Sequence, residues 1–127
     1  MKFTPINPPR RFEVGLHSEI TISECAHIEL DADELVTFKT ESGTEYDIGR
    51  KSWGYYATPS MNQRLPNHGL RPALVYNPDG RYFVMLVEKG MEDDFFKYLD
   101  DEHQQLVTWL DSTEHLDAIR HSIANTK

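Results

Sequence analysis

The chain has 127 residues, with 39% hydrophobic and 27% charged side chains and a formal net charge of −8 at pH 7. This length and composition predict one globular domain with its own core and argue against disorder. The acidic balance argues against nucleic acid as a partner, because phosphates are repelled on average. A single cysteine excludes an internal disulfide framework and favours a reducing compartment.

The amino-terminal sequence lacks the apolar segment of a signal peptide, and no apolar run reaches the roughly 20 residues of a membrane helix. We therefore expect a cytoplasmic protein without a membrane partner. The charge is uneven along the chain, since residues 48–87 carry +4 and the remainder carries −12. If folding keeps the basic part together, one face of the protein attracts anions.

The first third of the chain predicts strands. Residues 1–10 contain three prolines and are expected to form an extended arm, followed by a short strand over residues 11–15. Residues 19–30 alternate apolar and polar side chains with the period of a strand, and Glu24 is the one exception on the apolar face.

Further strands are predicted over residues 34–40 and 44–49, joined by a Glu-Ser-Gly turn. Residues 71–76 and 81–88 predict a hairpin, because the Asn-Pro-Asp-Gly sequence between them suits a tight turn. The second strand of this hairpin is apolar on both faces, which predicts a central strand covered on each side.

The pattern then changes to a helical period. Apolar residues of the region 91–110 fall on one helical stripe, and Asp111 with Glu114 resembles the capping box of a second helix. The order predicts an α+β fold in one domain, 1–127. It consists of a mostly antiparallel sheet over residues 11–89, curled into a sandwich or partial barrel, and one or two carboxy-terminal helices within 91–123.

The segment RKSWGYYATPSMNQR, residues 50–64, combines cations, aromatic rings and small polar groups, and we call it the basic–aromatic segment. Arginine and lysine bind phosphate or carboxylate, aromatic rings stack on a base or sugar, and serine and asparagine bond hydroxyls. The predicted ligand-binding residues are Arg50, Lys51, Trp53, Tyr55, Ser60, Asn62, Arg64 and Arg71.

Two other interpretations of this segment stay open. Trp53 and Tyr55 can belong to the core while the cations pair with the many carboxylates, in which case Arg64→Ala costs stability rather than ligand affinity. Alternatively, the same composition is typical of a protein–protein contact, with a second copy of the chain or an acidic protein as the partner.

Cys25, His27 and Glu29 share one face of the strand predicted over residues 19–30. They are candidate catalytic residues, as acid–base or nucleophilic groups, or metal ligands in the manner of a cupin-like barrel. A cupin-like site needs a second nearby histidine, which His27 lacks, so no metal or other cofactor is assigned and a polar, solvent-facing strand remains the alternative. Glu102 interrupts the apolar helical stripe and is either buried with a partner or exposed at a frayed turn.

The runs ESGTEYDIGRKSWGYYATPSMNQRL and GRYFVMLVEKG resemble a group of small uncharacterised bacterial proteins, over residues 11–110. The resemblance implies a link to bacterial surface-polysaccharide synthesis and carries no catalytic residue. Together with the basic–aromatic segment it predicts a protein that binds, or an enzyme that acts on, an anionic sugar or nucleotide-sugar. The alternatives are an interaction module that forms a homodimer or binds an acidic partner, and a cupin-like metal-dependent sugar isomerase.

Overall fold

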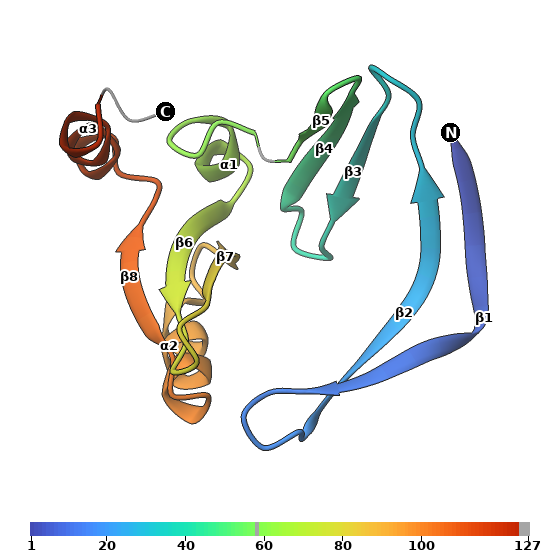
Figure 1. Cartoon of the computed structure of the whole chain (residues 1–127), viewed down its shortest axis with the longest axis horizontal. Helices are drawn as coiled ribbons and strands as arrows, with labels where there is room; N and C mark the ends of the chain where they lie inside the picture. The colour runs from blue at the N-terminus through green and yellow to red at the C-terminus, as the bar shows by residue number, and fades with distance from the viewer. Residues whose placement is uncertain (58, 125–127) are drawn as a thin grey trace. The chain divides into compact units, whose positions relative to one another are not determined.

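The computed structural model describes residues 1–57 and 59–124. It contains mostly antiparallel strands with three helices, which confirms the α+β prediction. The strands, labelled in Figure 1, are β1 (Lys2–Val14), β2 (Ile20–Glu29), β3 (Leu35–Lys39), β4 (Glu45–Lys51), β5 (Gly54–Tyr56), β6 (Leu70–Tyr76), β7 (Tyr82–Glu88) and β8 (Gln105–Trp109). The helices are α1 (Arg64–Asn67), α2 (Glu92–Asp101) and α3 (Thr113–Ser122).

The contacts within the chain divide it into two compact units. The first unit comprises residues 1–36 and 48–56, and the second comprises residues 37–47 and the chain from residue 57 onward. The strands form three separate sheets of order β1-β2, β3-β4-β5 and β7-β6-β8. The β3-β4-β5 sheet contains residues of both units. Within the described residues, no helix combines the length and apolar character needed to cross a membrane.

The first unit is dominated by the long β1-β2 ribbon (Figure 1). Residues 1–10 are extended as predicted, but they form a paired strand rather than a free arm. The pairing is irregular between Pro5 and Arg10, because prolines have no N–H group for the ladder. No residue of this unit is buried, although the apolar face predicted for β2 is more covered than its polar face.

The second unit contains the core. Ala73 and Val75 of β6 pack against Leu99 of α2, surrounded by partly buried apolar residues. These surrounding residues are Met85, Phe95, Leu106 and Trp109. The predicted hairpin is confirmed as β6-β7, but β6 is the central strand and β7 lies at the edge, so the prediction that residues 81–88 form a central strand is wrong.

The prediction that residues 91–110 form one continuous helical stripe is also wrong. Helix α2 ends at Asp101, His103 adopts a positive φ of 53°, and residues 105–109 pair with β6 as strand β8. Apolar spacing alone fits either element here. The β-branched and aromatic residues Val107, Thr108 and Trp109 favour a strand, and β6 supplies an edge for it.

Candidate functional site

The predicted ligand-binding residues, seven in the basic–aromatic segment and Arg71 beyond it, are divided between the two units. Arg50, Lys51, Trp53 and Tyr55 belong to the first unit, whereas Ser60, Asn62, Arg64 and Arg71 belong to the second.

In the first unit, the tight β4-β5 hairpin presents aromatic rings to solvent. Gly54 has a φ of 150°, where a side chain is strained, and its carbonyl accepts a 2.9 Å hydrogen bond from Arg50 Nη1. The Arg50 guanidinium also lies 5.5 Å from the ring centre of Tyr55. Trp53, Tyr55 and Tyr56 are 72%, 58% and 60% exposed. The hairpin thus holds three rings outward on a braced turn.

The remaining cation of this turn, Lys51, pairs with Asp33 through its ammonium group. The backbones of the same regions are tied together, since Asp33 N–H donates to Arg50 O at 2.7 Å and Arg50 N–H donates to Glu34 O at 2.8 Å. Neither Arg50 nor Lys51 is thus free of an intramolecular partner.

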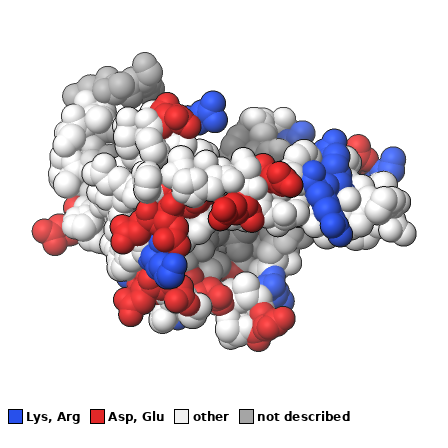
Figure 2. Space-filling model, turned by 90° about the horizontal axis from the view of Figure 1, so that it is seen from below, with Lys and Arg blue, Asp and Glu red and all other residues white. Residues whose placement is uncertain are grey.

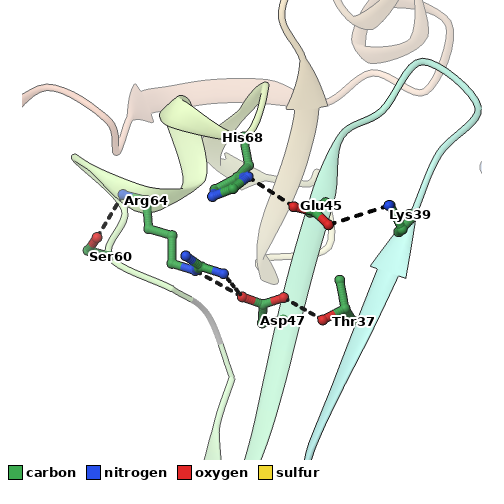
Figure 3. Close-up of polar contacts among 7 residues, drawn as sticks. All are labelled: Thr37, Lys39, Glu45, Asp47, Ser60, Arg64 and His68. Carbon is green, nitrogen blue, oxygen red and sulfur yellow. Dashed lines mark hydrogen bonds and ion pairs between the residues drawn. The ribbon is translucent and has the colours of Figure 1, made fainter.

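In the second unit, Arg64 at the start of α1 reaches Asp47 of β4 (Figure 3). Its Nε and Nη2 atoms donate to Asp47 Oδ2 at 2.9 and 2.6 Å, and Thr37 Oγ1 donates to Oδ1 at 2.8 Å. The Asp47 side chain is only 11% exposed. The hydrogen bond from Thr37, followed by that from Arg64, holds the pKa of Asp47 below its ordinary value.

A second carboxylate on the same face of β4 continues this network. Glu45 lies 3.0 Å from His68 Nδ1 and 3.6 Å from Lys39 Nζ (Figure 3). The backbone is joined at the same place, because Glu45 N–H donates to His68 O at 3.3 Å. These contacts fasten α1 and the residue that follows it to β4.

The other predicted polar ligands also have structural contacts. Ser60 Oγ accepts a 2.8 Å hydrogen bond from Arg64 N–H and so supports the start of α1. Asn62 Nδ2 donates to Thr113 Oγ1 at 3.1 Å. Each side chain therefore helps to join the segment to a helix of the second unit.

Arg71 makes a compact ion cluster between β6 and the helices. Its Nε donates to Asp111 Oδ2 at 2.7 Å, its Nη1 donates to Glu92 at 3.2 Å, and its guanidinium lies 3.8 Å from the Trp109 ring centre. The hydrogen bond to Asp111 raises the pKa of Arg71 above its ordinary value. An anionic ligand would have to displace two carboxylates to reach this cation.

The candidate catalytic residues lie exposed on one face of β2, as predicted from the alternation. They do not engage one another: Cys25 Sγ contacts Ser23 O at 3.5 Å, His27 lies 3.4 Å from Glu24, and Glu29 lies 3.8 Å from Lys2. Among the described residues, no group of three or more His, Cys, Asp or Glu side chains is arranged to hold a metal ion. Glu102, at the end of α2, is buried.

Sequence reasoning missed the residues that neutralise the cations. Glu45 and Asp47 alternate with Tyr46 and Ile48 in the predicted strand. The sequence therefore predicts that the two carboxylates share one face of the strand. Their pairing with His68 and Arg64 depends on the tertiary fold and has no local signal.

Comparison with known proteins found no relative of this chain. No family model matches the chain, and no curated protein or solved structure matches it.

Proposed function

We propose that the protein is a protein–protein interaction module that associates with a second copy of itself through the β4-β5 hairpin, on which the rings of Trp53, Tyr55 and Tyr56 are exposed. The observation that carries the proposal is the exposure of these three rings on a braced hairpin. Tryptophan and tyrosine are enriched among the residues that dominate binding energy at protein interfaces.

The ion pairs of the predicted ligand-binding cations favour this function over anionic-sugar binding. Arg64 and Arg71 each hold carboxylates of the chain, and Lys51 holds Asp33. A phosphate or sugar acid would compete with these pairs and leave carboxylates of the chain without their counter-charge.

A second copy is the partner that fits best. The first unit has no buried residue, and a two-stranded ribbon is at best marginally stable in water without a surface to pack on. Exposed apolar side chains also occur along this ribbon, at Phe3, Phe12 and Ile22. An exposed apolar surface of this kind is usually buried against a partner. A second copy of the chain is always available as that partner, and most soluble oligomers are homo-oligomers.

Sedimentation equilibrium of wild-type protein and of Trp53→Ser tests the proposal. We expect a concentration-dependent dimer for the wild type and a dissociation constant about 30-fold higher for Trp53→Ser, which corresponds to the loss of about 2 kcal/mol at a central aromatic contact. Tyr82→Ser, which removes a similarly exposed ring from β7 in the second unit, is the matched control and should leave the dimer unchanged. A monomeric wild type, or equal dimerisation by Trp53→Ser, would contradict the proposal.

A further inference from the structure

An apolar groove of about 390 Å³ lies in the second unit along β7 and α2. It is lined by residues 85–88 of β7 and by Met91, Asp94, Phe95 and Tyr98. Successive residues of a strand point to opposite faces, so a groove lined by four in a row opens along the strand's edge. The backbone of β7 therefore contributes to the groove.

That edge of β7 has no neighbouring strand in the described sheet, whose order is β7-β6-β8. At the two ends of the β6-β7 ladder, Asn77 N–H donates to Arg81 O and Lys89 N–H donates to Gly69 O, both at 2.9 Å. Hydrogen-bonded pairs alternate along an antiparallel ladder, so odd-numbered residues of β7 bond to β6. The backbone groups of Val84 and Leu86 consequently point outward, where an added strand would bond.

The side chains along this edge are apolar as well. Tyr82 and Val84 are 63% and 53% exposed, and Phe83 is exposed beside them. Natural edge strands usually carry charges or proline that discourage pairing, and residues 82–87 contain neither. The edge is thus suited to accept another strand.

The charged residues that line the groove share one sign. Its charged lining residues, Glu88 and Asp94, are both acidic. Hydrogen bonds from Ser42 and Thr40 hold the pKa of Glu88 below its ordinary value. Helix α2 has five acidic residues, and its one basic residue, Lys97, is paired with Asp101 at 2.8 Å. In the left half of Figure 2, red acidic side chains cover more of the surface than blue basic ones.

We propose that β7 binds an extended segment of a partner protein that alternates apolar side chains with lysine or arginine. The segment would add to the sheet as a fourth strand, bonding the outward backbone groups of Val84 and Leu86. Its apolar side chains would pack against Met85 and Phe95, and its cations would face Asp94 and the acidic residues of α2. This site lies in the second unit and does not depend on the self-association proposed for Trp53.

The test begins with a phage-displayed library of random decapeptides selected on the wild-type protein. We expect enrichment of peptides that alternate apolar residues with Lys or Arg. The most enriched peptide, labelled with a fluorophore, is then titrated against variants by anisotropy. Val84→Pro removes one outward N–H and should weaken binding about fivefold or more, the equivalent of one backbone hydrogen bond, whereas Val84→Thr, which keeps that N–H, should bind within twofold of wild type.

A second pair of variants tests the charge. Asp94→Lys should weaken binding about fivefold or more, whereas Asp93→Lys, an equal charge reversal outside the groove lining, should have a smaller effect. If Val84→Pro fails to fold, the comparison of Asp94→Lys with Asp93→Lys is the deciding test of the binding site. Failure to enrich any sequence, enrichment of peptides without basic residues, or equal binding by both members of the decisive pair would overturn the proposal. Self-association of the wild type that Asp94→Lys abolishes would also overturn it, in favour of a second copy at this edge.

Discussion

Removal of the Arg64 side chain separates a structural role for this arginine from a ligand-binding role. Arg64→Ala deletes two hydrogen bonds to Asp47, at 2.9 and 2.6 Å, and leaves a carboxylate that is only 11% exposed with Thr37 as its remaining side-chain donor. Hydrogen bonds to charged groups contribute about 1.5–3 kcal/mol each. The Arg64 side chain is 53% exposed, so solvent screens the pair and the lower end applies.

We therefore expect Arg64→Ala to reduce the free energy of unfolding by about 1.5 kcal/mol, which lowers the Tm by roughly 4–8 °C for a chain of this size. Urea denaturation and a thermal melt followed by circular dichroism measure the two quantities. Arg81→Ala is the matched control, because Arg81 is an exposed arginine of the β6-β7 turn, and it should leave the Tm within about 1 °C.

A double-mutant cycle with Asp47→Asn assigns the loss to this pair. If Arg64 acts through Asp47, the two substitutions together cost less than the sum of their separate effects, by about 1 kcal/mol. An Arg64→Ala variant that melts with the wild type, or fully additive losses in the cycle, would refute the structural role and return Arg64 to the candidates for ligand binding.

Three further predictions follow from other contacts. Because Asp47 has a lowered pKa in the folded protein, its contribution to stability is present above about pH 4 and is lost as the pH falls below that; Asp47→Asn should show a shallower loss of stability in acid denaturation between about pH 5 and 2. Arg71→Lys keeps the charge but loses the fork that joins Asp111 and Glu92, so urea denaturation should show a loss of about 1–2 kcal/mol, and a variant as stable as wild type would contradict the cluster's importance. Gly69→Ala should cost about 1–2 kcal/mol, because φ is 89° there and an added Cβ would lie 3.0 Å from Thr44 Cγ2; an unchanged denaturation midpoint would show that this turn relaxes freely.

The elements that the sequence predicts well are those with local signals. Strand β2 has a period-two pattern, and the turns before β4 and β7 contain the residues that such turns require. In strand β8 the local signals conflict, because the residue types favour a strand whereas the spacing of Leu106 and Trp109 also fits a helix. The strand exists through pairing with β6, about thirty residues earlier. Edge and central strands are likewise distinguished by nonlocal pairing.

The candidate site shows the same division. Composition alone identifies the cations and rings of residues 50–64 as a notable group. It does not identify the partners of the predicted ligand-binding cations, since Arg64 pairs with a residue 17 positions away and Arg71, outside this segment, with one 40 positions away. Whether a cation is free for a ligand depends on such pairs. Here the pairs favour a contact made by exposed aromatic rings over anion binding.

The fluorescence of Trp53 tests the proposed self-association most directly. A Trp109→Phe variant leaves Trp53 as the one tryptophan of the chain and retains an aromatic ring beside Arg71. As protein concentration rises through the dimer's dissociation constant, the account predicts a shift of Trp53 emission to shorter wavelength and weaker quenching by acrylamide, because the ring leaves water. Emission and quenching that stay those of a fully exposed indole at every concentration would contradict it.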